Sequence, residues 1–423
     1  MLQLNFIHNN KAKIIDRLAI KNFDASTIIE EIIELDINRK ATQTELDKAL
    51  AETNKLAKEI GNLYKTGQRE KAEEIKNRSG ELKLAAKDLE QALSNNISLL
   101  NEKLIEIPNI PHESVPAGKS DSDNELVYEE GNIPSLPNNA KPHWELASEY
   151  DIIDFDLGSK VTGAGFPFYK GKGARLQRAL INFFLDEAIE KGYIEYQPPL
   201  LINSDSAYGT GQLPDKEGQM YHINEDSLYL IPTAEVPITN IYRNVILKSE
   251  DFPIKNVAYS NCFRREAGSY GKYVRGLNRL HQFDKVEIVQ IQDPEKSYET
   301  LEEMKDQIAD LLRKLELPFR IVRLCGGDLS FTAALTYDFE VYSAAQKRWL
   351  EVSSVSNFES FQSNRMKLRF KDKDGKSQFA HTLNGSALAL PRIVAAMLEN
   401  NQTSKGIRIP NALQGYTKFD IIN

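Results

Sequence analysis

The first stretch that could carry chemistry is Arg264-Arg265-Glu266, which follows an apolar run and precedes a polar loop containing glycine. A second apolar run at residues 280–291 follows the loop, so the pattern predicts two strands joined by a long connection. The connection carries three basic residues, Lys272, Arg275 and Arg279. Because the planar guanidinium group can hold two phosphate oxygens at once, this loop is suited to a polyanion. The alternative is a solvated surface pair of Arg and Glu.

Three further stretches place carboxylates, hydroxyls or an arginine at the end of an apolar run. These are Thr233-Ala234-Glu235, Glu351-Val352-Ser353-Ser354, and Arg392, which follows Pro391 where a helix is expected to begin. Carboxylate and hydroxyl oxygens suit Mg²⁺, which keeps several waters and prefers nucleotide phosphates as partners. Taken singly, each stretch is equally well explained as a helix cap or the end of a strand.

The elements near the amino terminus follow a helical period. Apolar residues recur at alternating steps of three and four over residues 28–63 and again over residues 75–104, where the seam includes Ile97. The first run skips steps at Arg39, Thr42 and Thr53. A break at residues 65–68 separates the runs, so we predict an antiparallel helical hairpin over about residues 27–104. Each arm would be roughly 50 to 60 Å long. A coiled coil that joins separate chains fits the same pattern.

The helical pattern ends at Pro108 and Pro111, and the polar stretch at residues 118–124 is typical of a linker. Beyond it, strand-like runs alternate with helical segments at residues 174–191 and 298–315. We therefore expect two domains, at residues 1–110 and 111–423.

Composition sets wider limits. The chain has 423 residues, 41% of them hydrophobic, which favours more than one domain. No apolar run approaches the roughly 20 residues that span a bilayer. Its two cysteines, Cys262 and Cys325, are too few for a disulfide framework or a cysteine zinc motif, so we expect a cytoplasmic location. The net charge of −8 argues mildly against a nucleic-acid binder, although an acidic body can still carry a local basic surface.

In their order and spacing, these stretches resemble one family, the seryl-tRNA synthetases of class II. Residues 192–201 resemble motif 1 of that class, residues 263–266 with 275–287 resemble motif 2, and residues 384–392 resemble motif 3. Three longer stretches resemble the seryl branch: residues 109–116, 208–214 and 266–269. The family's motif 3 often has several glycines, whereas Ala387 and Pro391 stand at two of these small-residue positions here. This departure puts the local backbone conformation in doubt.

The resemblance covers essentially the whole chain and implies an α+β fold. The expected architecture is an antiparallel sheet flanked by helices, with the hairpin as an amino-terminal arm. The implied activity is activation of L-serine with ATP, followed by transfer to tRNA for serine, with tRNA for selenocysteine as a further candidate. It also implies Mg²⁺ and a homodimer through the motif 1 region.

By analogy with the family, specific residues acquire roles. Arg264 and Arg392 would be catalytic, contacting the α-phosphate and the γ-phosphate. Glu266 would accept from the adenine amino group, Phe283 would stack on the ring, and Glu351 with Ser354 would bind Mg²⁺. The full expected ATP set is Arg264, Arg265, Glu266, Leu280, Phe283, Glu351, Val352, Ser353, Ser354 and Arg392. The expected serine set is Thr233, Ala234, Glu235, Arg264, Glu287, Asn384 and Ser386. Among these, Thr233, Glu235, Glu287 and Ser386 are candidates for the ammonium and hydroxyl contacts, in either assignment.

In the family the arm binds the long variable arm of the tRNA and recognises its shape and its phosphates. The candidate contacts are basic: Lys58, Lys65, Arg69, Lys71, Lys76, Arg78, Lys83 and Lys87. Ordinary ion pairs along the helix face explain any single one of these residues equally well.

Two other functions for the whole chain are alternatives to a seryl-tRNA synthetase. One is a synthetase-like protein that binds nucleotide or tRNA, or aminoacylates a carrier protein, without charging tRNA. The other is a structural coiled-coil protein, which leaves residues 125–423 unexplained.

Overall fold

The computed structural model describes residues 1–266 and 275–423 and divides into two compact units. The first unit comprises Met1–Ala19 and Phe23–Pro108, and the second comprises Ile20–Asn22 and Asn109–Asn423. No helix in the described part of the chain is long and apolar enough to cross a membrane. Both cysteines are buried and unpaired.

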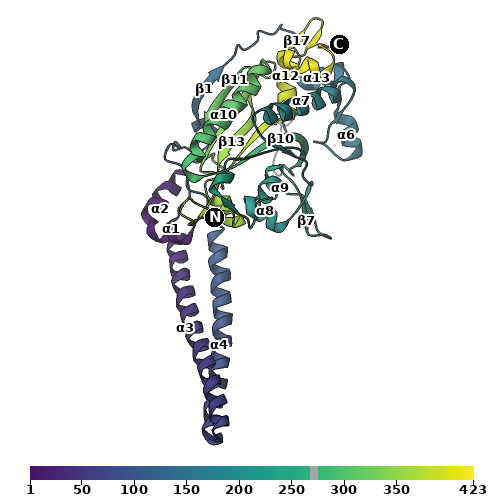
Figure 1. The fold of residues 1–423 in the computed structure, drawn as a ribbon. Helices are drawn as coiled ribbons and strands as arrows, with labels where there is room; N and C mark the ends of the chain where they lie inside the picture. The colour runs from purple at the N-terminus through teal and green to yellow at the C-terminus, as the bar shows by residue number, and fades with distance from the viewer. Residues whose placement is uncertain (267–274) are drawn as a thin grey trace. The chain divides into compact units, whose positions relative to one another are not determined.

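The first unit is helical, and two long helices dominate it (Figure 1). Its helices are α1 Leu4–Asn9, α2 Lys11–Ile20, α3 Ser26–Lys65 and α4 Arg69–Leu104. The two long helices run side by side and are joined by a tight turn, in which Gly67 has a φ of +75°. A left-handed φ is readily adopted by glycine, so the glycine at the predicted break allows the chain to reverse. The predicted antiparallel hairpin is confirmed.

The seam between the long helices differs from the predicted pattern in two places. Thr53, expected as an interruption, is buried, and its hydroxyl donates to the carbonyl of Ala49 at 2.8 Å. That bond satisfies the polar group, so a threonine can occupy the seam. Ile97, expected within the seam, is 41% exposed. Near the tip, α4 buries small residues one heptad apart: Ala72, Ser79 and Ala86.

The second unit is organised around an eight-stranded sheet. Every neighbouring pair in it is antiparallel except β4 with β9, so the sheet is largely antiparallel, as predicted. Its strands, in order across the sheet, are β1 Glu125–Glu130, β11 Phe319–Arg323, β12 Leu335–Ser343, β13 Arg348–Asn357, β16 His381–Ala389, β10 Gln282–Gln292, β9 Ile254–Phe263 and β4 Ile194–Tyr196.

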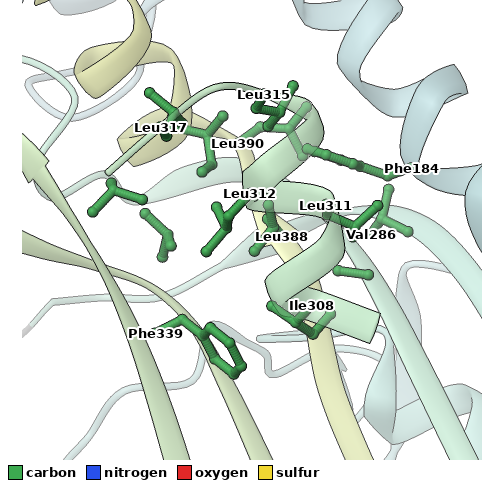
Figure 2. Close-up of a cluster of buried hydrophobic side chains, with 14 of the residues drawn as sticks. Phe184, Val286, Ile308, Leu311, Leu312, Leu315, Leu317, Phe339, Leu388 and Leu390 are labelled. Atoms are coloured by element: carbon green, nitrogen blue, oxygen red, sulfur yellow. The ribbon is translucent and has the colours of Figure 1, made fainter. Parts of the chain in front are cut away.

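One face of the main sheet packs against three helices, α7 Gly171–Glu190, α10 Ser297–Lys314 and α12 Leu390–Asn400. Figure 2 shows part of this core, with Leu311 and Leu312 of α10 beside Val286 and Leu388 of the sheet. Side chains alternate along a strand, so residues next to the core positions point to the opposite face. That opposite face, called the polar face below, carries the candidate site.

Smaller elements surround the sheet. The remaining helices are α5 His143–Glu149, α6 Phe155–Val161, α8 Ser204–Thr210, α9 Glu235–Asn240, α11 Phe361–Met366 and α13 Asn411–Thr417, with 3-10 turns at Asp121–Asp123, Ser249–Asp251 and Pro294–Lys296. The minor sheets contain β2 Ile153–Asp154 with β3 Phe168–Tyr169; β5 Leu201–Asn203, β7 Leu228–Leu230 and β6 His222–Ile223; β15 Ser377–Phe379, β14 Arg369–Lys371 and β8 Ile246–Lys248; and β17 Gln402–Thr403, β18 Gly406–Arg408 and β19 Ile421–Ile422.

Candidate active site

A buried carboxylate, Glu287 of β10, is the centre of a polar cluster on the polar face. Its Oε2 accepts hydrogen bonds from the hydroxyls of Thr233, at 3.2 Å, and of Ser386, at 3.5 Å. The ammonium group of Lys285 lies 2.6 Å from the same oxygen, and the two side chains are only 7% and 3% exposed. Ser386 faces Glu287 directly across β16 and β10. The cluster therefore joins residues from two strands and from the turn that precedes α9.

A second buried carboxylate, Glu235, begins α9. Burial raises the pKa of Glu235 to about 7, and the nearby charge of Glu287 adds to this effect. A hydrogen bond from Gln362 and the positive charges of Lys285 and Arg264 lower the pKa and oppose the shift. The closest of these contacts runs from Nε2 of Gln362 to Oε1 of Glu235, at 2.7 Å. Glu235 has no contacting cation among the described residues, in contrast to Glu287.

Two arginines leave the sheet where β9 ends. Arg264 and Arg265 are exposed, and the Arg264 guanidinium lies 5.4 Å from the centre of the Phe283 ring. An exposed guanidinium over an aromatic face is an ordinary cation–π contact. It brings together the residue expected at the α-phosphate and the residue expected under the adenine.

The loop between β9 and β10 is partly outside the described residues. Lys272 and the 267–269 part of the seryl stretch fall there. On its far side, the Arg275 guanidinium lies 5.0 Å from the centre of an indole ring. Arg279 donates to Glu266 at 2.8 Å, so the carboxylate expected at adenine has a cation beside it. Of the three predicted basic residues, these two have protein partners.

The arginine at the start of α12 is fixed by two backbone carbonyls. Nη1 of Arg392 donates to the carbonyl of Glu351 at 2.7 Å, and its Nε donates to the carbonyl of Asn278 at 3.1 Å. The same guanidinium lies 3.4 Å from the Glu351 carboxylate. Two residues of the expected ATP set, distant in sequence, are therefore adjacent.

The candidate magnesium ligands, Glu351 and Ser354, lie beside a second acid, Asp338. The hydroxyl of Ser354 donates to Asp338 on the neighbouring strand β12. Burial raises the pKa of Asp338 well above its usual range, and the nearby Glu351 carboxylate raises it further. Two acids that are held close together without an equal positive charge favour a cation. The two carboxylates and the hydroxyl fit Mg²⁺, which completes its coordination with water and phosphate oxygens.

Several predicted site residues have little side chain to offer a ligand. Those whose side chains lie in apolar core clusters, and could contribute only backbone atoms, are Ala234, Leu280 and Val352. The Ser353 hydroxyl donates to the carbonyl of Ser386 at 2.6 Å, which ties β13 to β16. Asn384 is 7% exposed on β16, two residues from Ser386 and on the same face.

Three residues of the site were not predicted: Lys285, Asp338 and Gln362. The signal for Lys285 was present, because the period of two along β10 places it on the same face as Glu287. Asp338 stands in a largely apolar run that also contains Glu340, and the sequence gives it no evident partner. Gln362 is 127 residues from Glu235 in the sequence, and no local pattern connects them.

Comparisons with known proteins match both parts of the chain to known families. Residues 219–401 match the family "tRNA synthetase class II core domain (G, H, P, S and T)", and residues 1–111 match the "Seryl-tRNA synthetase N-terminal domain". The serine--tRNA ligase of Salinibacter ruber is 48% identical over 99% of this chain and 98% of its own length. That of Caldicellulosiruptor saccharolyticus is 49% identical over the full length of both.

The chain belongs to the seryl-tRNA synthetase family. A crystal structure of seryl-tRNA synthetase from Pyrococcus horikoshii complexed with ATP superimposes with a TM-score of 0.88 at 34% identity, covering 100% of this chain and 99% of that one. The resemblance drawn from the motifs and the predicted fold class of a seryl-tRNA synthetase are both confirmed.

Proposed function

We propose that the chain activates L-serine with ATP, giving seryl-adenylate and pyrophosphate, and then transfers serine to the 3′ end of tRNA for serine. The observation that carries the proposal is the buried polar cluster around Glu287, which lies on the same sheet as the ATP candidates. The full-length similarity to serine--tRNA ligases supports it. Nothing in these relatives favours a synthetase-like protein that does not charge tRNA.

The two steps need positioned reactants and stabilised charge more than a protein nucleophile. In the first, a serine carboxylate oxygen bonds to the α-phosphorus of ATP, and the bond to pyrophosphate breaks. In the second, a terminal ribose hydroxyl attacks the acyl carbon and AMP leaves. Arg264 is suited to the α-phosphate, because it stands exposed over the Phe283 ring and its positive charge acts on Glu235. Arg392 is suited to the far phosphates and is preorganised by its two carbonyl contacts.

The contacts of the two acids favour one assignment over the other. Glu287 already has an ammonium partner in Lys285, so a second cation there would be redundant. It lies next to the hydroxyls of Thr233 and Ser386, and a further hydroxyl extends this network. Glu235 is buried with an amide as its contacting partner, so its charge calls for a cation. We assign the serine hydroxyl to Glu287 with Ser386, and the serine ammonium to Glu235.

Substrate analogues test this assignment. Alanine lacks the hydroxyl, and glyceric acid lacks the ammonium group. In Glu287→Gln, the preference for serine over alanine should fall, and inhibition by glyceric acid, which keeps the hydroxyl, should weaken as well. In Glu235→Gln, serine should lose affinity while glyceric acid binds as well as it does to the unmodified enzyme. The reverse pattern would exchange the two roles, and no change in either variant would remove both residues from the serine site.

The metal proposal rests on Glu351, Ser354 and the acid that the sequence did not predict, Asp338. When bound with ATP, Mg²⁺ would neutralise phosphate charge. The protein's own contribution is to hold the two carboxylates and the hydroxyl in place: Ser354 is tied to Asp338, and Glu351 lies beside Arg392.

The division of labour between the units is also proposed. Residues 1–110 would bind tRNA through the hairpin, and residues 111–423 would carry out catalysis. Ion pairs already involve two of the candidate arm residues, Lys76 with Glu73 at 3.2 Å and Arg78 with Glu52 at 2.5 Å. The better candidates for phosphate contact are therefore Lys58, Lys65, Arg69, Lys71, Lys83 and Lys87. We propose tRNA for selenocysteine as a further substrate, which a charging assay with that tRNA tests.

A homodimer through the motif 1 region has a physical basis in the sheet. Strand β4 forms one edge of the main sheet, where Ile194 is 61% exposed. Leu200 and Leu201, where β5 of a minor sheet begins, are 37% and 39% exposed. Apolar side chains along an open strand edge are stabilised when a second copy covers them. A cytoplasmic location remains the expectation from cysteine usage.

A further inference from the structure

The buried carboxylate Glu235 is held by a side chain from a distant part of the chain. Gln362, in α11, is 1% exposed, and its Nε2 donates to Oε1 of Glu235 at 2.7 Å. The same nitrogen donates to the carbonyl of Thr210, at 3.2 Å. On the other side of the amide, Oε1 of Gln362 accepts from the hydroxyl of Thr382, at 2.7 Å. The amide is thus bound to three different segments.

These partners determine which way the amide points. In the reversed orientation, its oxygen would face the Glu235 carboxylate and the Thr210 carbonyl, and three acceptors would meet without a proton among them. The observed orientation gives both acceptors a donor and uses the Thr382 hydroxyl to satisfy the amide oxygen. Gln362 therefore presents a fixed N–H donor to Glu235.

The helix that carries Gln362 is itself anchored. Arg365, one turn further along α11, donates from Nη1 to the carbonyls of Tyr208 and Leu213, at 3.2 and 3.1 Å. Its guanidinium also lies over the rings of Tyr208 and Phe361, 4.9 and 5.0 Å from their centres. Residues 208–214, one of the stretches that resemble the seryl branch, are thus bound at both ends by α11.

The charged groups around Glu235 come from several elements. Glu287 on β10 disfavours its ionised form, whereas Lys285 on β10 and Arg264 after β9 favour it. A hydrogen bond donated to a carboxylate favours the ionised form as well. Among the described residues, only Gln362 donates a hydrogen bond directly to a carboxylate oxygen of Glu235. No hydrogen bond from the described residues reaches the other oxygen, Oε2.

We propose that Gln362 is a positioning residue for serine: it keeps Glu235 ionised and turns the second carboxylate oxygen toward the serine ammonium. The inference rests on the proposed role of Glu235 in serine binding. Gln362 itself touches neither substrate nor the reacting atoms. Its effect is expected in the binding of serine and absent from the binding of ATP.

The test is the full-length enzyme with Gln362→Met, which keeps the length of the side chain and removes the amide. Serine-dependent exchange of labelled pyrophosphate into ATP gives the KM for serine and for ATP over pH 5.5 to 8. Loss of a hydrogen bond to a charged group predicts a rise in the KM for serine of about 10- to 100-fold. The KM for ATP should stay within about twofold, and the acid limb of kcat/KM for serine should move upward by about one pH unit.

Gln290→Met is the matched control. Gln290 is also buried, at 2% exposure, and its Nε2 donates to the Tyr193 hydroxyl at 2.6 Å, away from the polar cluster. This variant should lose thermal stability without a change in the KM for serine or in the pH profile. A purely structural role for Gln362 would make the two variants behave alike and would overturn the proposal.

Two further variants keep the outcome decisive. Gln362→Glu has the same size but replaces the donor by a second acid, so its KM for serine should rise at least as much. An unchanged KM for serine in a folded Gln362→Glu or Gln362→Met enzyme would overturn the proposal. Glu235→Gln separates this failure from that of the underlying assignment. If Glu235→Gln impairs serine binding and the Gln362 variants do not, only the positioning role is wrong.

Discussion

Replacing Glu287 by alanine removes the carboxylate that accepts from Thr233 and Ser386, and it leaves the Lys285 ammonium buried without its anion. Two effects are therefore expected in the same variant. The serine hydroxyl loses its acceptor, and the folded state must hold an uncompensated charge. The structure allows the two effects to be separated.

The magnitudes follow from the contacts. A hydrogen bond to a charged group contributes about 1.5 to 3 kcal/mol, and a site that fully exploits a substrate hydroxyl discriminates by about 10⁴ or more. We expect kcat/KM for serine to fall between about 10²- and 10⁴-fold. Breaking a buried ion pair costs about 3 to 5 kcal/mol of stability, whereas replacing both partners with apolar residues is often neutral. The double variant Glu287→Ala, Lys285→Met should therefore regain stability without regaining serine activation.

The assay is exchange of labelled pyrophosphate into ATP, with the concentrations of serine and ATP varied in turn. Thermal unfolding measures the stability of each variant. The KM for ATP should stay within about twofold in both variants, because the ATP candidates lie at other positions on the sheet. Near-normal serine activation in Glu287→Ala would refute the role of this carboxylate. Recovery of serine activation in the double variant would show that the single change acted through folding alone.

Three further predictions concern other parts of the molecule. Because the pKa of Glu235 is raised to about 7 and the serine ammonium needs the ionised carboxylate, kcat/KM for serine should fall about tenfold per pH unit below pH 7, while the KM for ATP stays flat. A plateau down to pH 5.5 would contradict this role. Deletion of residues from Glu52 to Leu84 should abolish charging of tRNA but leave pyrophosphate exchange intact; equal loss of both would show a folding role for the arm. Asp338→Asn should raise the Mg²⁺ concentration needed for exchange by about 10- to 100-fold at unchanged KM for serine, and an unchanged Mg²⁺ requirement would exclude Asp338 from the metal site.

The hairpin and the strands of the site could be predicted because their signals are local. Heptad spacing with a single glycine break gives α3 and α4, and two apolar runs around a basic loop give β9 and β10. The seam was less predictable in detail. Thr53 can be buried in the seam because its hydroxyl donates a hydrogen bond to the carbonyl of Ala49. A pattern of hydrophobic residues does not reveal such a bond.

The residues that organise the site were harder to predict, because their partners are distant in the sequence. Motif resemblance supplies Glu287 and Arg392 but gives no contacts for them. The pairing of Glu351 with Arg392 depends on β13 meeting the start of α12, and the support of Glu235 by Gln362 depends on a helix 127 residues away. Such contacts follow from the tertiary arrangement. Of the three residues that were not predicted, only Lys285 could have been inferred from the sequence, from the alternation of side chains along β10.

The most direct test of the central claim is exchange of labelled pyrophosphate into ATP with each of the twenty amino acids in turn, without tRNA. Exchange with serine alone is the predicted result, since it requires both adenylation and a site that recognises the hydroxyl. Exchange with a different amino acid would keep the class II chemistry and contradict the specificity assigned to Glu287 and Glu235. Exchange with none would contradict the proposed activation of serine and favour a protein that binds nucleotide or tRNA without charging it.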